Sequence, residues 1–186
     1  MTRPRGRPSQ GKGVTRDDIL TGALALLGEG GGQGLTMRAL ASRLGVTPMS
    51  LYHHVEDHTG LLRALSDRVY AEVLDAEVGQ TEHRTKVRAI LMRYYDAVGS
   101  HPQLTLAIFA SPGAFAGLTR QITDRLTVLL AKFTAKPSLW RDILIDHAHG
   151  SGLTLSSAQG DRKREQTLRE QYQLALDHLL DRLADS

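Results

Sequence analysis

The chain has 186 residues, which allows one large domain or two small ones that share a surface. Hydrophobic residues make up 41% and charged residues 23%, so the composition excludes a disordered chain and a membrane protein. The absence of cysteine excludes a disulfide scaffold, a thiolate metal site and a cysteine nucleophile. No apolar run is long enough for a membrane helix or a signal peptide, so we expect a cytoplasmic protein.

Positive charge is concentrated at the N-terminus, although the net charge is only +3. We assign residues 1–14 to a basic arm that we expect to be disordered, and a polyanionic partner is predicted at this end. Arg5 and Arg7 flank a glycine between two prolines, and this run resembles the core of an AT-hook, which enters the minor groove of A·T-rich DNA. A solvated tail without a partner is the alternative for this arm.

Helical periodicity dominates the rest of the chain, so we expect an all-α protein. Thr15 and Asp18 have the spacing of a capping box at the start of a first helix. A run of glycines from Gly28 predicts the end of that helix. Because the run follows a helix and lacks the Gly-Lys-Ser/Thr of a P-loop, the pattern does not favour a phosphate-binding loop.

In the next segments, residues that start and end helices have the spacing of a helix-turn-helix. Thr36 is suited to cap a second short helix, Gly45 to end it, and Thr47 with Pro48 to start a third. The glycine-containing break between them is typical of the turn in this motif. In a recognition helix over residues 47–55, Leu51 and Val55 would anchor the helix to the core while its polar residues face outward. We place the helix-turn-helix domain at residues 15–60.

A longer linking helix is predicted over residues 57–78, with apolar residues along one side. Beyond it, proline and glycine at residues 99–102, 111–113, 136–138 and 157–160 divide the remainder into five helical segments.

The last two segments have features of a dimerisation surface. The apolar spacing in the final helix alternates between three and four, and the segment before it carries small residues that allow close helix packing. They could build half of a four-helix bundle with a second copy, or they could pack inside one subunit, and periodicity does not decide between these. The candidate interface residues are Ala148, Ser151, Gly152, Leu155, Leu168, Tyr172, Leu176, Leu179 and Leu183.

Residues 35–55, LTMRALASRLGVTPMSLYHHV, resemble the DNA-binding domain of TetR-family transcriptional regulators. The resemblance is greatest to the tetracycline-repressor branch, through Leu51-Tyr52-x-His54-Val55 and the pair Leu61-Leu62, and covers about residues 15–75. It implies a homodimeric repressor in which each subunit contributes one helix-turn-helix domain, called its reading head below. The two reading heads would contact the half-sites of a near-palindromic operator. Residues 61–186 would then form a helical regulatory, ligand-binding and dimerisation domain.

The predicted DNA contacts combine residue chemistry with this resemblance. Serine and histidine can bond to base edges, and Tyr52, Thr36 or Arg38 can reach a phosphate. His58 stands where many family members have a phosphate-binding lysine, so we expect weaker non-specific affinity and some pH dependence of DNA binding. The full prediction is Arg5, Arg7, Thr36, Arg38, Thr47, Pro48, Met49, Ser50, Tyr52, His53, His54 and His58.

The resemblance also implies a pocket for a small-molecule effector, whose binding would move the linking helix and separate the reading heads. Residues with apolar bulk and a polar edge are the candidates for its lining, although each is also an ordinary core type. They are Tyr94, Tyr95, His101, Phe109, Phe115, Trp140 and His147.

Other function classes have weaker support in the sequence. Ser151 lies between glycines but lacks the Gly-x-Ser-x-Gly pattern and a preceding strand, and the group of Asp142, Asp146 and His149 equally suits a solvated helix face. The histidine pairs do not share one helix face, so we expect no metal, no cofactor and no catalytic residue. An effector-independent architectural protein that binds DNA through its arm is the alternative, and a small all-α enzyme is disfavoured.

Overall fold

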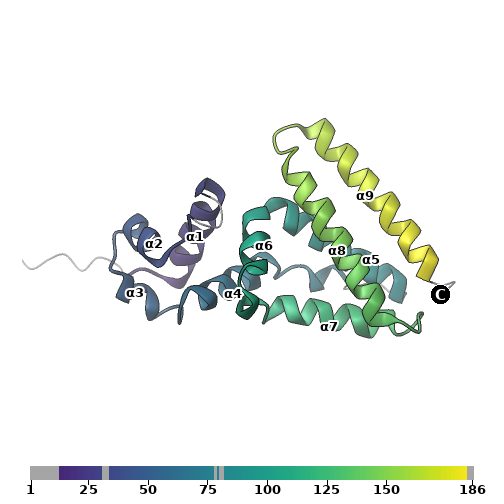
Figure 1. The fold of residues 1–186 in the computed structure, drawn as a ribbon, viewed down its shortest axis with the longest axis horizontal. Coiled ribbons are helices and arrows are strands. Elements are labelled where there is room, and N and C mark those ends of the chain that lie inside the picture. The colour runs from purple at the N-terminus through teal and green to yellow at the C-terminus, as the bar shows by residue number, and fades with distance from the viewer. Residues whose placement is uncertain (1–12, 31–33, 78, 80–81, 184–186) are drawn as a thin grey trace, which may run out of the picture.

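The computed structural model describes residues 13–30, 34–77, 79 and 82–183 of the chain, so Arg5 and Arg7 lie outside the described residues. The described part is helical and contains no strand, which confirms the all-α prediction (Figure 1). Its elements are α1 (Arg16–Gly30), α2 (Met37–Leu44), α3 (Pro48–Tyr52), α4 (His58–Val69), η1 (Leu74–Glu77), α5 (His83–Ser100), α6 (Pro102–Phe109), η2 (Pro112–Ala114), α7 (Leu118–Leu130), α8 (Pro137–Ser156) and α9 (Arg162–Leu183). None of the helices in the described ranges is both long and apolar enough to cross a membrane.

Helices α1 to α3 form a small unit at one end of the molecule (Figure 1). The predicted capping box is present, because the Asp18 amide donates to Thr15 Oγ1 at 3.1 Å and the Thr15 amide donates to Asp18 Oδ2 at 2.9 Å. Helix α1 continues through Gly28 to Gly30, two residues further than the glycine run predicts. The unit is closed by buried residues from each of its three helices, among them Ile19, Leu40 and Leu51.

The turn between α2 and α3 is built as the sequence predicts. Thr36 caps α2 by accepting from the Ala39 amide, and Thr47 caps α3 by accepting from the Ser50 amide. Gly45 ends α2 with a φ of 66°, in the left-handed region that glycine adopts without a steric cost. Pro48 occupies the first turn of α3, where its missing N–H is not needed.

The linking helix is shorter than predicted. Helix α4 begins after Asp57, which accepts from the Gly60 amide at 2.7 Å, but it ends at Val69 and not near residue 78. A turn follows, and then the short 3-10 helix η1, which packs against α5. The buried Tyr70 leaves the helix with its hydroxyl bonded to Thr105 Oγ1 on α6 at 3.2 Å. Tertiary packing therefore overrides the helical pattern, although the segment also contains strong helix formers such as Ala71, Glu72 and Leu74.

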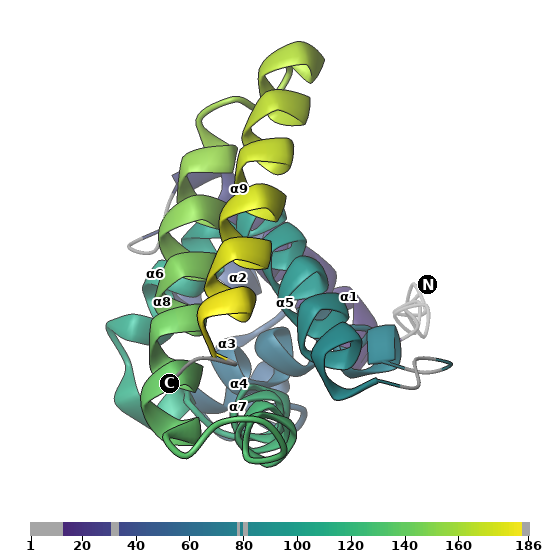
Figure 2. The ribbon, with the colours of Figure 1, turned by 90° about the vertical axis from the view of Figure 1, so that its right-hand side faces the viewer.

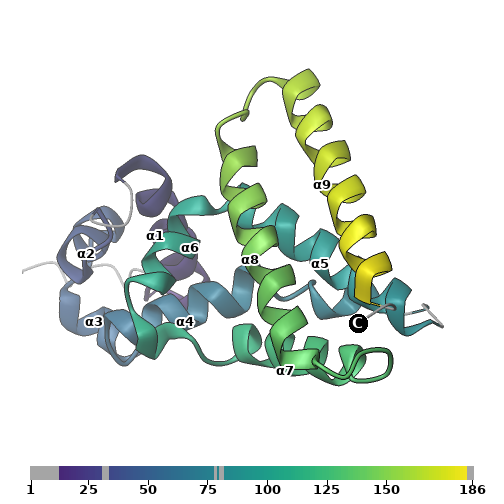
Figure 3. The same cartoon turned by 45° about the vertical axis from the view of Figure 1, so that its right-hand side comes forward.

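The remaining five α-helices agree in number with the prediction and form the larger body of the molecule. Helices α5 and α8 share the most extensive contact, and α7 and α9 pack on them (Figure 3). Gly152 makes the approach of α8 to α5 possible, because a Cβ there would lie 2.7 Å from Val98 Cγ1. Helices α8 and α9 run side by side as a hairpin that projects beyond the body (Figures 1 and 2).

The apolar stripe of α9 is buried inside its own chain. The Tyr172 hydroxyl donates to the Leu91 carbonyl oxygen at 3.2 Å, and Arg88 forms an ion pair with Asp177 at 2.7 Å, so α9 is fastened to α5. Five of the predicted interface residues are therefore core residues, which corrects their assignment to a subunit interface. They are Ala148, Gly152, Tyr172, Leu176 and Leu183, whereas Ser151, Leu155, Leu168 and Leu179 are half-buried and stay a prediction.

Candidate nucleic-acid interface and inner cavity

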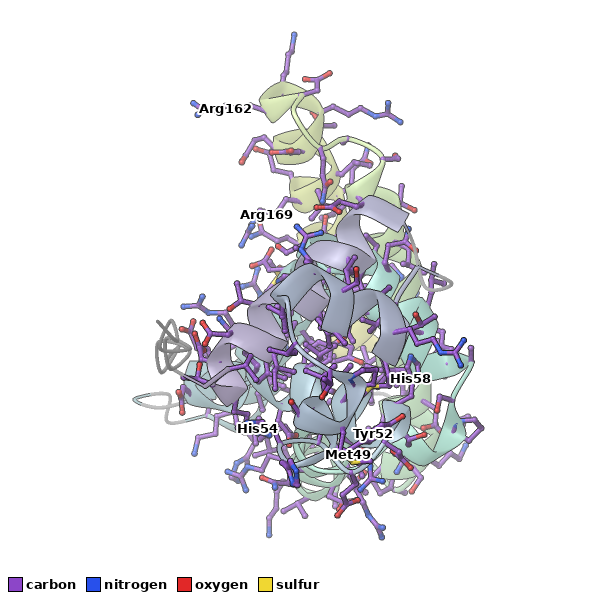
Figure 4. The ribbon with its side chains drawn as sticks, turned by 90° about the vertical axis from the view of Figure 1, so that its left-hand side faces the viewer. Met49, Tyr52, His54, His58, Arg162 and Arg169 are labelled. Atoms are coloured by element: carbon purple, nitrogen blue, oxygen red, sulfur yellow. The ribbon has the colours of Figure 1, made fainter. Side chains whose placement is uncertain are left out.

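Helix α3 and its flanks present most of the predicted DNA-contact residues on one surface. Met49 is 67% exposed and Tyr52 is 44% exposed, while Leu51 and Val55 are buried and hold the helix to the core as predicted. Figure 4 shows Met49 and Tyr52 close together at the end of the molecule formed by the helix-turn-helix, with His54 to one side of them. Thr47, Pro48 and His53 are also exposed, and Ser50 is half-buried. These residues define what we call the α3 surface.

The hydroxyl groups of the α3 surface also hold its backbone in place. Thr47 Oγ1 lies 3.0 Å from Ser50 Oγ, and both belong to the first turn of α3. Thr36, at the start of α2, uses one lone pair for its cap. A hydroxyl has one donor and two acceptor sites, so each group keeps capacity for an external partner.

The two arginines of α2 differ in whether their side chain is already paired with a carboxylate. Arg43 makes a two-pronged contact with Glu29 on α1, at 2.7 Å and 2.9 Å. The hydrogen bonds from Arg43 lower the pKa of Glu29 and keep this ion pair charged. Arg38 is exposed and has no ion-pair partner among the residues that the structure describes. Arg38 is therefore the arginine of α2 that is free to meet a phosphate or a guanine.

His58 makes a hydrogen bond inside the protein. Its ring is half-buried, and Nε2–H donates to the Leu35 carbonyl oxygen at 3.0 Å. The contact joins the start of α4 to the loop before α2. Because Nε2 is used internally, only Nδ1 is left for an external partner, and the contact of His58 with a DNA phosphate stays a prediction.

A second feature is a cavity inside the larger body, next to the end of α4. It measures about 40 Å³ and is lined by residues from α5, α6, α7 and α8, with Tyr70 just after α4 and Phe115 just after η2. The lining residues are Tyr70, Tyr94, Thr105, Ile108, Phe109, Phe115, Thr119, Thr123, Ile145 and His149. Three of the predicted ligand residues, Tyr94, Phe109 and Phe115, converge here.

The other four predicted ligand residues lie outside this cavity, and a ligand contact for them stays a prediction. Tyr95 on α5 and His147 on α8 both stack against Tyr172 on α9. Their ring centroids lie 4.1 Å and 5.2 Å from the centroid of Tyr172. His101 lies at the junction of α5 and α6, and Trp140 packs against the core outside the cavity. Successive positions on α5 and α8 point to different sides of a helix, so Tyr94 and His149 reach the cavity while Tyr95 and His147 do not.

Two hydrogen-bonded pairs stand among the rings of the cavity wall, Tyr70 with Thr105 and Tyr94 with His149. Tyr94 Oη and His149 Nε2 lie 2.7 Å apart and share a hydrogen bond. Burial raises the pKa of Tyr94 well above its ordinary value and lowers the pKa of His149, so both groups are neutral near pH 7. Tyr70 stacks on Tyr94 with centroids 5.2 Å apart, and Phe109 meets the His149 ring edge-on at 4.7 Å.

Sequence reasoning missed seven lining residues: Tyr70, Thr105, Ile108, Thr119, Thr123, Ile145 and His149. Tyr70 was assigned to a continuing helix, and the threonines resemble ordinary polar positions of amphipathic helices. The spacing of Tyr94 and His149 in the sequence gives no sign that they meet, because their contact depends on how α5 and α8 cross.

The alternatives to DNA binding gain no support from the structure. Asp142 is bonded to Arg141, Asp146 is exposed, and His149 faces the cavity, so the three do not form one site. Across the described ranges, no three His, Cys, Asp or Glu side chains are grouped to hold a metal ion.

Comparison with known proteins places the helix-turn-helix in a family. The family described as "Bacterial regulatory proteins, tetR family" matches residues 19–65. An uncharacterized HTH-type transcriptional regulator of Mycobacterium tuberculosis, Rv0681, is 31% identical over 62% of this chain and 54% of its own length. The tetracycline repressor protein class D of Escherichia coli is 35% identical over 47% of this chain and 44% of its own length. The chain thus spans about half the length of the curated relatives it matches.

Solved structures resemble the chain over nearly its whole length. The crystal structure of BioQ with its natural double-stranded DNA operator has a TM-score of 0.70 at 25% identity, and covers 93% of this chain and 99% of BioQ. TetR-Q116A from Acinetobacter baumannii AYE, solved in complex with minocycline, has a TM-score of 0.70 at 21% identity, and covers 93% of this chain and 99% of its own. The second likeness concerns the fold alone.

Proposed function

The chain belongs to the TetR family of transcriptional regulators, and from this premise we propose that it is a repressor that binds a near-palindromic operator as a homodimer and is released by a small molecule. The observation that carries the proposal is the placement of α4. One end of this helix is tied to the helix-turn-helix through His58 and the Leu35 carbonyl, and the other end leads into Tyr70, which lines the cavity. A ligand in the cavity would therefore act on the element that positions the reading head.

In this proposal the α3 surface reads the major groove. A five-residue helix presents few side chains, so base contacts fall to Met49, Ser50 and Tyr52 with the flanking Thr47 and His54. Arg38 and Thr36 would bind the phosphate backbone, and the basic arm with Arg5 and Arg7 would reach the adjacent minor groove. BioQ, which shares the fold, was solved with its natural DNA operator, and this supports the proposal.

The cavity is proposed as the effector site. The A. baumannii TetR variant with the same fold was solved with minocycline, which supports a small-molecule ligand within this architecture. We keep the division proposed from the sequence, with an arm at 1–14, a reading domain at 15–60 and a regulatory domain at 61–186.

The homodimer is proposed to form on the outer face of α8 and α9. The predicted residues that are not buried, Ser151, Leu155, Leu168 and Leu179, belong to this hairpin. Large apolar residues are also exposed there: Leu139 and Ile143 on α8 and Leu174 on α9. Exposed apolar side chains on neighbouring helices favour burial against a second copy.

The test is selection of bound fragments from a random DNA pool by the purified protein at near-physiological salt, followed by sequencing. Enrichment of an inverted repeat is the expected result, because two symmetric heads read two half-sites. A Tyr52→Ala variant should lose the enrichment, and Arg43→Gln on α2 is the matched control because Arg43 is already paired with Glu29. Diffuse A·T enrichment would favour an architectural protein that binds through its arm, and no enrichment would contradict both readings.

A further inference from the structure

Among the residues that the structure describes, none that lines the cavity carries a permanent charge. Its lining consists of aromatic, aliphatic and threonine residues with one histidine, and no Asp, Glu, Lys or Arg contributes to it. Burial lowers the pKa of His149 and so favours its neutral imidazole. The charge of Asp146 acts in the opposite direction on this pKa, but its effect is smaller. An ionised ligand group would lose its hydration here without gaining an opposite charge, and such a transfer is strongly unfavourable.

Most of the hydroxyl groups in the lining are already used. Thr119 Oγ1 donates to the Ala116 carbonyl oxygen and Thr123 Oγ1 donates to the Arg120 carbonyl oxygen, both at 2.7 Å. Thr105 Oγ1 is shared with the Tyr70 hydroxyl. Thr119 and Thr123 therefore keep acceptor sites but no free hydrogen, whereas the Tyr94–His149 pair holds a phenol and an imidazole within 2.7 Å of each other, so its phenol and imidazole can offer a donor or an acceptor to a ligand.

The rings of the lining provide flat apolar surfaces. Tyr70 and Tyr94 are stacked with an angle of 26° between their planes, while Phe109 stands at 90° to His149. Aromatic ligands pack against such faces and edges in offset or edge-on geometry.

The cavity is too small for an organic ligand unless part of its wall moves. A volume of about 40 Å³ holds no more than a few water molecules, so an organic ligand has to displace side chains. Phe109 is 54% exposed and Phe115 is 51% exposed, although both belong to the lining. These two rings are the least tightly packed part of the wall, and a ligand that moved them would gain their apolar surface.

We propose that the effector is an uncharged, planar aromatic molecule with a single hydroxyl or carbonyl group that hydrogen-bonds to the Tyr94–His149 pair. The proposal rests on the regulatory function proposed above and specifies the chemistry of its ligand. It excludes carboxylates, phosphates and other ionised metabolites as effectors at this site.

The test uses three probes of equal ring size, 2-naphthol, naphthalene and 2-naphthoate, titrated into the full chain at pH 7 by calorimetry. Binding of 2-naphthol is expected to be about tenfold tighter than that of naphthalene, the value of one hydrogen bond of about 1.4 kcal/mol. 2-Naphthoate, which is ionised at this pH, should bind at least about a hundredfold more weakly than 2-naphthol. Equal or tighter binding of 2-naphthoate would overturn the proposal, and so would a failure of 2-naphthol to bind below about 1 mM.

Variants locate the hydrogen bond. Tyr94→Phe removes one hydroxyl and should abolish the advantage of 2-naphthol over naphthalene while leaving naphthalene binding unchanged. His147→Gln is the matched control, since His147 lies on the same helix but stacks on Tyr172 outside the cavity. An equal loss of 2-naphthol binding in His147→Gln would contradict the site. The comparison of the three probes on the unaltered chain needs no variant and stands even if Tyr94→Phe fails to fold.

The outcome also separates this inference from the proposed function. A protein that selects an inverted repeat but binds no neutral probe would refute only the ligand chemistry. A protein that binds 2-naphthol but enriches no DNA would refute only the repressor assignment. Release of the selected DNA by 2-naphthol, and not by 2-naphthoate, would support both.

Discussion

Asp67 on α4 accepts a hydrogen bond from the backbone amide of Leu118, the first residue of α7, at 2.8 Å. The residue before Leu118 is Gly117, which offers no side-chain cap to α7, so Asp67 supplies the cap from another helix. Helix α7 carries Thr119 and Thr123 of the cavity wall. The carboxylate of Asp67 thus joins the linking helix directly to the cavity.

We expect Asp67→Ala to lower the free energy of unfolding by about 1–3 kcal/mol, because it leaves the Leu118 amide, at the start of α7, without its acceptor. The measurement is urea unfolding at pH 7. Asp75→Ala is the control, since Asp75 is exposed on η1, and should change stability by less than about 0.5 kcal/mol. Equal effects of the two substitutions would show that the contact with Leu118 contributes nothing.

Gly117→Ala should destabilise the protein by about 1–3 kcal/mol. Gly117 has a φ of 58°, and a Cβ at this position would lie only 2.3 Å from Asp67 Oδ1. Gly28→Ala is the opposite case, because Gly28 lies in α1 with open space around it, and should stabilise by about 0.5–1 kcal/mol. Thermal unfolding of the two variants should shift in opposite directions, and a Gly117→Ala protein as stable as the parent would contradict the geometry.

His58→Lys should exchange stability for DNA affinity. The substitution removes the hydrogen bond to the Leu35 carbonyl, which contributes about 1 kcal/mol, and adds a cation near the reading head. We expect a lower midpoint of urea unfolding and tighter binding to non-specific DNA at low salt. His58→Gln, which adds no charge, should show no gain in DNA affinity. A tighter His58→Gln protein would indicate that the charge is not the cause.

Arg38→Gln should reduce the slope of log K against log salt concentration by about one, as expected for the loss of one phosphate contact. Arg43→Gln on the same helix should leave the slope nearly unchanged, since Arg43 is paired with Glu29. Fluorescence anisotropy on the selected operator at several salt concentrations measures both. An unchanged slope with altered base preference would assign Arg38 to a guanine and not to the backbone.

The stability of the protein should fall as the pH is lowered through 6.5. Burial lowers the pKa of His149, His101 and His147 from the ordinary value of 6.5, so the unfolded chain binds more protons than the folded chain just below that pH. Stability is then complete above pH 6.5 and is lost as the pH falls toward the folded values. Unfolding between pH 8 and pH 5.5 measures the slope, and it should be smaller in His149→Gln. A slope unaltered by this variant would exclude a contribution from His149.

The local signals in the sequence predict the reading domain well. Capping residues and glycine act on their nearest neighbours, and Thr36, Gly45 and Thr47 are found in the roles that their chemistry favours. The buried anchors Leu51 and Val55 follow from helical spacing alone. Local physics was therefore sufficient for this part of the fold.

The cavity could not be predicted in the same way, because it depends on how distant helices cross. Tyr94 and Tyr95 are adjacent in the sequence, yet one lines the cavity and the other stacks on Tyr172. Likewise His58 has the position of a phosphate contact in the family, but its ring donates a hydrogen bond to the carbonyl oxygen of Leu35, 23 residues earlier in the chain. Long-range packing decides both cases, and a pattern of spacing does not contain it.

Because α4 ends at Val69, in the proposed mechanism it rotates through a larger angle when one of its ends is displaced. With 12 residues, α4 is about 18 Å long, whereas a helix over residues 57–78 would measure about 33 Å. If the end near Tyr70 is displaced by about 1 Å while the other end is held, the shorter rod rotates by about 3° and the longer one by about half as much. The turn after Val69 therefore nearly doubles the angle through which α4 rotates for a given displacement of its end, and in the proposed mechanism a small shift in packing at the cavity is enough to turn the helix-turn-helix.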